Sequence, residues 1–244
     1  MKLLKSLLVL LIAAAAPARA ADIDSIQKLL QGQFRLLSED LGAALSYKPL
    51  SPAEPLGITG FDVGVSVTAT RLRNLDILDL ATSSGNVPTV LPVPTLRAHK
   101  GLPFDIDVGV MLSQVPGTNI QFFGGELKYA LLAGGVAMPA VAVRGSFTKL
   151  NGVDQLKLDT KGLDISISKG FLMATPYAGV GRVWVSSTPN VVTPLGTLPL
   201  TGETFGLNKM FVGLNFNLML LNLAVEADRT GEVTSVGLKA GLRF

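Results

Sequence analysis

The residues that could carry acid–base chemistry in this chain lie close to its single histidine. His99 is followed by Asp105 and Asp107, and a histidine near a carboxylate is a common arrangement for general-base catalysis. Two aspartates separated by one residue also arise wherever a strand alternates between a polar and an apolar face. The Asp-x-Asp pair therefore gives no metal site, and we expect no metal and no cofactor. A hydrolase that uses His99 is the least favoured of three hypotheses for function.

Composition excludes several other kinds of site. The chain has no cysteine, which excludes disulfides, thiol catalysis and cysteine-ligated metals. Lys2, Lys5 and Arg19 lie within the first twenty residues, so 21 basic residues less these three leave 18, against 18 acidic ones. A balanced chain does not provide the basic surface that nucleic acid requires, and we expect no nucleic-acid partner.

The first twenty residues have the features of a secretory signal peptide. Lys2 and Lys5 precede an apolar run at residues 7–16, and Ala-Arg-Ala at residues 18–20 is a small-residue cleavage site. The apolar run is shorter than the roughly 20 residues of a membrane-spanning helix. We therefore expect residues 1–20 to be cleaved from an exported protein.

The elements that must position the polar residues are strands, because the chain alternates with period two from residue 60 onward. Residues 61–70 and 232–244 are the clearest cases, with one apolar and one polar face. The pattern predicts ten strands, or twelve if residues 34–47 supply two more. Within residues 155–168 the apolar parity switches between Leu158 and Leu163, which predicts a β-bulge.

Residues 232–244, which end on Phe244, resemble the terminal strand of Gram-negative outer-membrane β-barrels, whose last residue is typically Phe. The resemblance implies an all-β fold: a transmembrane antiparallel up-and-down β-barrel at residues 60–244. It also implies a location in the bacterial outer membrane, contact with the lipid bilayer, and recognition of the C-terminal strand by the barrel-assembly machinery.

Loop lengths predict the direction of the strands. If Phe244 ends at the periplasm, the long connections at residues 74–92 and 188–202 lie outside, as expected for such barrels. A periplasmic aromatic girdle then comprises Phe61, Phe104, Phe171 and Phe244.

Alternation also predicts a set of charged side chains that face the lumen. A ten-strand barrel is narrow, so mixed charges should pair and close it, which excludes a wide porin pore. The predicted lumen-facing residues are Asp62, Asp105, Asp107, Glu126, Lys128, Arg144, Asp164, Glu226, Asp228, Lys239 and Arg243.

Residues 21–59 form a separate N-terminal unit, either a plug in the lumen or a periplasmic cap. A helical stripe predicts a helix at residues 21–41, with Asp22 or Asp24 as N-cap, followed by a proline-rich connector. The layout of residues 22–70 resembles the hatch of FadL-like hydrophobic-compound transporters, although Ser51 stands where that family's Asn-Pro-Ala motif has asparagine.

Two functions remain open besides the hydrolase. The uncharged loops at residues 86–94 and 188–202 suggest contact with something apolar. The leading hypothesis is a barrel that binds or passes a small hydrophobic compound through a narrow lumen plugged or gated by residues 21–59. The alternative is a structural or adhesive barrel that presents its outer loops to a partner.

Overall fold

The computed structural model describes residues 22–83, 87–191 and 199–244. The expected signal peptide, residues 1–20, lies outside the described residues. None of the described helices is long and apolar enough to cross a bilayer.

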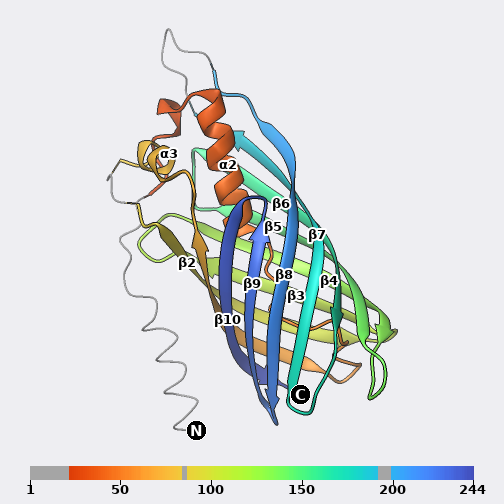
Figure 1. The fold of residues 1–244 in the computed structure, drawn as a ribbon. Helices are drawn as coiled ribbons and strands as arrows, with labels where there is room; N and C mark the ends of the chain where they lie inside the picture. The colour runs from red at the N-terminus through yellow and green to blue at the C-terminus, as the bar shows by residue number, and fades with distance from the viewer. Residues whose placement is uncertain (1–21, 84–86, 192–198) are drawn as a thin grey trace.

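Ten antiparallel strands close into a barrel, as predicted (Figure 1). Each strand pairs with its neighbours in sequence, and β1 closes the ring by pairing with β10 from Asp62–Arg243 to Arg71–Thr234. The strands are β1 (Phe61–Arg71), β2 (Val90–Leu102), β3 (Ile106–Gln114), β4 (Gln121–Ala133), β5 (Ala140–Asn151), β6 (Leu156–Ser168), β7 (Ala174–Pro189), β8 (Glu203–Leu218), β9 (Leu221–Thr230) and β10 (Val233–Arg243).

The two ends of the barrel differ. At the end that we call the turn end, strands are joined by short connections at residues 103–105, 134–139, 169–173 and 219–220, and Phe244 lies there. The other end, the loop end, has the longer connections, at residues 72–89 and 190–202. Residues 74–92 were expected to be a loop, but they contain helix α3 (Leu75–Leu80) and the start of β2.

The N-terminal helix is shorter and later than predicted. Instead of a helix at residues 21–41, the chain has a 3-10 turn η1 (Ile26–Lys28) and helix α2 (Gln31–Leu45). Ile23 forms an isolated β-bridge with Thr82, so its backbone is committed to a loop contact. The twelve-strand alternative is wrong, because residues 34–45 are helical.

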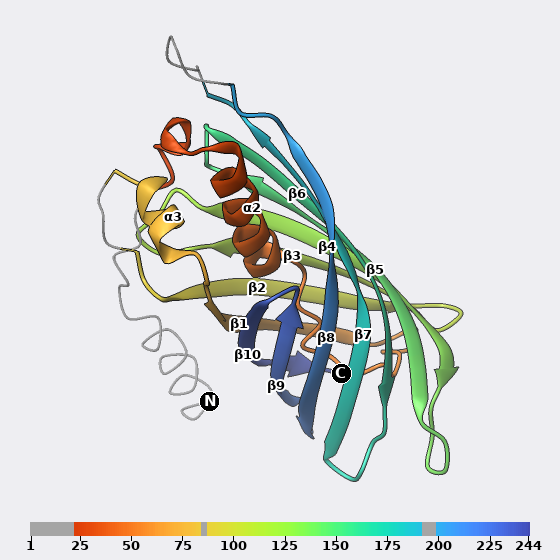
Figure 2. The ribbon, with the colours of Figure 1, turned by 45° about the horizontal axis from the view of Figure 1, so that its top comes forward.

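Helix α2 lies inside the loop end of the barrel, beside α3 (Figures 1 and 2). It packs against β6, β7, β8 and β10, and its apolar residues Phe34, Leu37 and Leu41 are fully buried. The wall facing it is apolar as well. Its contributing side chains are Leu91, Val93, Met111, Phe122, Leu150, Leu156, Leu158, Val183, Val185 and Phe205.

The apolar interior explains the change of parity in β6. The ladder of β6 with β7 is unbroken from Leu158 to Leu163, and the ladder with β5 is unbroken from Asp159 to Leu163, so the predicted bulge is wrong. Leu158 faces α2 and is buried, whereas Leu163 faces outward and is half exposed. The apolar side chains change face because the lumen is apolar at the loop end and polar further down.

Gly42 of α2 lies close to Val185 of β7, so a substitution at Gly42 tests how tightly the helix packs on the wall. A Cβ atom at Gly42 would lie 2.6 Å from Cγ2 of Val185, whereas one at Gly32 would meet nothing within 4 Å. We expect Gly42→Ala to destabilise the folded barrel by about 1–3 kcal/mol through overpacking. Gly32→Ala, the matched control, should be neutral or slightly stabilising. Denaturant midpoints of the two variants check this, and equal midpoints would contradict the packing of α2 on β7.

Candidate functional site

The inner segment, residues 46–57, joins α2 to the start of β1 inside the barrel. Its residues are buried from Ser46 to Ala53, and it has neither helix nor strand. Pro49, Pro52 and Pro55 explain this, because proline lacks a backbone N–H and fixes φ. The backbone groups of this segment must therefore find partners on the barrel wall.

Cationic side chains of the wall bind the carbonyl oxygens of the inner segment. Lys209 Nζ donates to the carbonyl of Tyr47 at 2.6 Å. Arg97 Nη2 donates to the carbonyls of Lys48, at 2.7 Å, and Pro49, at 3.1 Å. These contacts come from β8 and β2, so the segment is held from two sides of the lumen.

Lys128 on β4 continues this pattern toward the turn end. Its Nζ donates to the carbonyls of Pro52, at 3.1 Å, and Glu54, at 2.9 Å. A buried carbonyl oxygen without a hydrogen-bond partner is costly. Each cation therefore satisfies carbonyl oxygens of a proline-rich segment that forms no helix or strand.

Acceptors on the wall bind several N–H groups of the inner segment. Glu226 on β9 accepts the N–H of Leu50 at 2.8 Å and the hydroxyl of Tyr177 at 2.9 Å. Asp107 on β3 accepts the N–H of Leu56 at 3.0 Å. Wall and segment therefore complement each other along most of the polar half of the lumen.

Side chains of the inner segment also reach the wall. Lys48 forms a buried ion pair with Asp228. The hydroxyl of Tyr47 lies 3.1 Å from Nε2 of His99. The segment thus supplies a cation and a hydroxyl to the network.

Ion pairs within the wall run between neighbouring strands. Nε of Arg144 lies 2.7 Å from Glu126, as an ion pair without the alignment of a hydrogen bond, and Nη1 donates to Asp164 at 3.2 Å. Lys128 and Asp107 lie 2.9 Å apart. Opposite charges were expected to close the lumen by pairing, but these pairs lie along the wall, and the inner segment fills the centre.

Most of the predicted lumen-facing residues are buried on the inner wall. Asp105 is the exception: it is exposed, with φ +57° in the turn between β2 and β3, so its assignment to the lumen is wrong. Arg243 is half exposed at the end of β10. The buried ones are Asp62, Asp107, Glu126, Lys128, Arg144, Asp164, Glu226, Asp228 and Lys239.

Two inward-facing residues that hold the inner segment, Arg97 and Lys209, were not predicted, whereas a place in the wall was the favoured interpretation of His99. Arg97 and His99 lie on β2, which Pro94 weakens as a strand signal, and Lys209 lies between the inward aromatics Phe205 and Phe211. Parity alone would have found them, because Arg97 and His99 alternate with exposed Leu96 and half-buried Ala98.

His99 does not have the surroundings of an exposed catalytic base. Its side chain is buried, 3.1 Å from the hydroxyl of Tyr47 and 3.4 Å from Glu126. Asp105 is exposed in the turn between β2 and β3, and Asp107 forms an ion pair with Lys128. The structure therefore does not bring together the three residues of the least favoured hypothesis, a hydrolase.

The outer face carries a belt of apolar side chains on all ten strands. One exposed example from each strand is Val63, Leu96, Leu112, Leu127, Phe147, Ile165, Val180, Val212, Val225 and Leu238. At the turn end Phe61, Phe104, Phe171 and Phe244 are all exposed, and the rings of Phe61 and Phe244 lie 5.6 Å apart.

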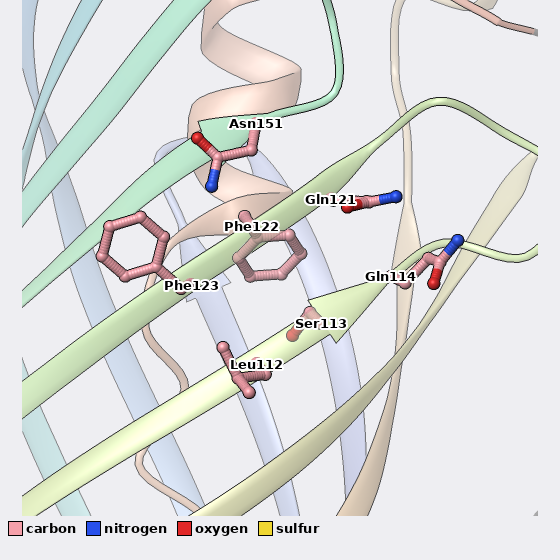
Figure 3. Close-up of a pocket in the computed structure, with 7 residues that line it drawn as sticks. All are labelled: Leu112, Ser113, Gln114, Gln121, Phe122, Phe123 and Asn151. Carbon is pink, nitrogen blue, oxygen red and sulfur yellow. The ribbon is translucent and has the colours of Figure 1, made fainter.

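The loop-end border of this belt is hollowed over β3, β4 and β5. A cavity of about 350 Å³ is lined there by Leu112, Ser113, Gln114, Gln121, Phe122, Phe123 and Asn151 (Figure 3). Gln114, Gln121 and Asn151 are paired in register across the three strands. They form a row of neutral amides directly beyond the apolar Leu112 and Phe123.

No family model matches the chain, and no curated protein matches it.

Among solved structures, the barrel is similar to small bacterial β-barrels. The N-terminal β-barrel domain of Pseudomonas aeruginosa OprF has a TM-score of 0.35 and 11% identity, over 77% of this chain and 99% of that one. Neisserial surface protein A has a TM-score of 0.32 and 11% identity, over 75% of this chain and 95% of that one. The KdgM porin has a TM-score of 0.37 and 9% identity, over 75% and 99%. The FadL-like resemblance of the N-terminal segment is not found.

Proposed function

We propose that this chain is an outer-membrane β-barrel whose lumen is sealed by its own N-terminal segment. The closed ring leaves no free strand edge, which is a requirement for a sheet that crosses a bilayer. On β4 the outward apolar positions run from Phe123 to Leu132. Ten residues at about 3.3 Å each, tilted by about 40°, give about 25 Å, the height of the apolar band of such barrels.

The inner segment is the plug of this barrel. The observation that carries the proposal is the matched bonding between the wall and the backbone of residues 47–56, from Lys209 on one strand to Asp107 on another. A wall whose polar side chains bond the backbone of this segment supports a functional role for the segment inside the lumen. The plug closes a polar path through the barrel until it is displaced.

The compound that the barrel binds or passes is small and hydrophobic in this proposal. The half of the lumen that opens to the outside is apolar, with Leu91, Phe122 and Val185 on its wall. Helix α2 now fills that space with Phe34 and Leu37. Displacement of α2 would leave an apolar site of matching shape at the loop end.

A structural or adhesive role is the second candidate, and one observation favours it. Leu30 is 73% exposed at the loop end, and Leu36, Leu80 and Val90 are also exposed in this part of the molecule. Exposed apolar groups outside the membrane belt are typical of a contact surface for a partner. In that case the plug would be permanent.

A reversible crosslink tests whether the plug gates the barrel. Oγ of Ser38 on α2 lies 2.8 Å from Oγ of Ser187 on β7, and the chain has no cysteine. We expect the intact protein to be silent in planar bilayers and to conduct in moderate urea, which opens the less stable parts of a protein first. The oxidised Ser38→Cys/Ser187→Cys variant should stay silent in the same urea.

Reduction of the disulfide is the internal control and should restore the urea-dependent conductance. A barrel that conducts without urea would contradict the seal. A barrel that stays silent at every urea concentration below unfolding of the wall would contradict gating and favour the adhesive role.

A further inference from the structure

Three turns at the turn end of the barrel carry large apolar side chains at their tips (Figure 1). We call them the apolar turns; they join β4 to β5 (residues 134–139), β6 to β7 (residues 169–173) and β8 to β9 (residues 219–220). Their fully exposed tip residues are Val136, Leu172 and Met219. The turn between β2 and β3 is not one of them, because it has the exposed, charged Asp105.

The backbone at two of these tips disfavours the residue that occupies it. Leu172 has φ +53° and Met219 has φ +59°, in the left-handed region, where a residue with a Cβ atom is strained and glycine is not. Turns at the loop end have glycine at positive φ instead, at Gly117, Gly152 and Gly231. The turn conformation therefore does not explain a large apolar side chain at Leu172 or Met219. Such strained and exposed positions indicate a contact outside the chain.

The apolar outer face of β6 is too short to cross a membrane without its turn. Its outward apolar residues are Leu163, Ile165 and Ile167, because the next outward residue toward the loop end is Lys161. Five residues at about 3.3 Å each, tilted by about 40°, span about 13 Å, whereas the apolar band of outer-membrane barrels is about 25 Å tall. Residues 163–172, which end at the turn tip, are as many as the ten residues of the band on β4.

The other strands that enter the apolar turns give the same result. Their first polar outward residues toward the loop end are Lys149 on β5, Arg182 on β7, Asn208 on β8 and Arg229 on β9. From the apolar residue before each of these to an apolar turn, the chain has nine or ten residues: 138–147, 172–180, 210–219 and 219–227. Measured from this polar border, the turns lie at the far edge of a band about 25 Å tall.

Lys169 is the only charged residue in the apolar turns, and its ammonium group is bonded within the protein. Its Nζ donates to the carbonyls of Gly135, at 2.8 Å, Val136, at 2.7 Å, and Met138, at 3.2 Å. The N–H of Gly135 donates to the carbonyl of Met138 at 3.0 Å. Hydrocarbon offers no partner to backbone carbonyls, and cations near it pair with such carbonyls. These bonds therefore suit a turn that contacts lipid.

We propose that the apolar turns insert into the hydrocarbon of the turn-end leaflet, where Val136, Leu172 and Met219 contact acyl chains and anchor the barrel. The proposal rests on the membrane placement of the barrel. The occupant is lipid because the turns continue the apolar belt, through exposed Ile167 and Leu218, and because their one charge is bonded to the backbone. The turns, and not the ends of the strands, then form the edge of the membrane-embedded surface on this side.

A tryptophan moved to a turn tip tests the insertion. The whole protein is placed in phosphatidylcholine vesicles with brominated acyl chains, which quench tryptophan fluorescence on contact. The single native tryptophan is replaced by Trp184→Phe. In that background we expect Leu172→Trp and Met219→Trp each to be quenched by the brominated chains and protected from iodide in the water. Val136→Trp, at a tip without positive φ, gives the same reading if a variant at a strained position does not fold.

Glu232→Trp in the same background is the matched control, because Glu232 is exposed in the loop-end turn between β9 and β10. Its fluorescence should be quenched by iodide and unaffected by the brominated chains. The same behaviour at positions 136, 172 and 219 would overturn the insertion and would leave these turns in water, free for a protein partner.

The unaltered protein separates this proposal from the membrane placement, because Trp184 faces outward on β7 and is 43% exposed. We expect brominated lipid to quench Trp184. Quenching of Trp184 but not of the turn-tip tryptophans would overturn the insertion alone. If the lipid quenches neither Trp184 nor the turn-tip tryptophans, the membrane placement and the proposed function are both wrong.

Discussion

A barrel that lacks residues 22–57 is expected to conduct ions in planar bilayers where the intact protein is silent. The deletion removes α2 and the inner segment, and the ion pairs that remain lie along the wall, such as Arg144 with Asp164. An emptied ten-strand lumen is wide enough for water, so the conductance should rise at least about tenfold above the baseline of the intact protein. Single-channel recording measures it.

The open lumen should discriminate weakly between cations and anions. Among the described residues, the inner wall then carries five basic and six acidic buried side chains, nearly in balance. The basic ones are Arg97, Lys128, Arg144, Lys209 and Lys239, and the acidic ones are Asp62, Asp107, Glu126, Asp164, Glu226 and Asp228.

A shorter deletion provides the control for this experiment. Removal of residues 22–30 leaves α2 and the inner segment in place, so the barrel should stay silent. Heat-dependent migration on SDS gels verifies that each deletion has folded. A folded barrel without residues 22–57 that still does not conduct would show that the wall closes by itself, as the sequence led us to expect.

Replacement of Arg144 by methionine is expected to cause the largest loss of stability of any single substitution in the lumen. Arg144 is fully buried and faces both Glu126 and Asp164. Removal of one partner of a buried ion network leaves uncompensated charge, which typically costs about 3–5 kcal/mol. The free energy of unfolding of the barrel in vesicles, measured with denaturant, checks this value.

Two further variants identify the cause of that loss. Arg182→Met makes the same change on the outer face, where the side chain is exposed, and should cost less than about 1 kcal/mol. Arg144→Met combined with Glu126→Gln and Asp164→Asn removes the unpaired charges and should recover part of the stability. A triple variant less stable than Arg144→Met would show that packing, and not charge, is what Arg144 supplies.

The strand number could be predicted because the outer face and the lumen of the barrel impose opposite requirements on alternate side chains. The same rule found buried acids such as Asp62 and Glu226. It failed at Asp105, where the alternation of β3 was extended into the preceding turn, and at Leu158, where the rule assumed a polar interior. A helix inside the barrel makes part of the lumen an ordinary hydrophobic core. Alternation along single strands cannot predict this, because it does not show what fills the lumen.

The position of the N-terminal segment in the barrel was harder to predict from the sequence. Ile23 and Ile26 lie on a helical stripe, yet they are buried against loop residues outside α2. The inner segment has no periodicity, since three prolines interrupt it. Its position is set by contacts with residues more than forty positions away, such as Arg97 and Glu226, which local patterns do not report.

The course of the N-terminal segment places the two ends of the described chain at opposite ends of the barrel. Ile23 is bridged to Thr82 at the loop end, while the inner segment leaves the lumen at the opposite end to begin β1 beside Phe244. In the proposed orientation, an epitope inserted ahead of residue 22 is displayed at the cell surface, and one attached after Phe244 stays in the periplasm. The ring of strands that closes between β1 and β10 thus encloses a segment that precedes every one of its strands in the chain.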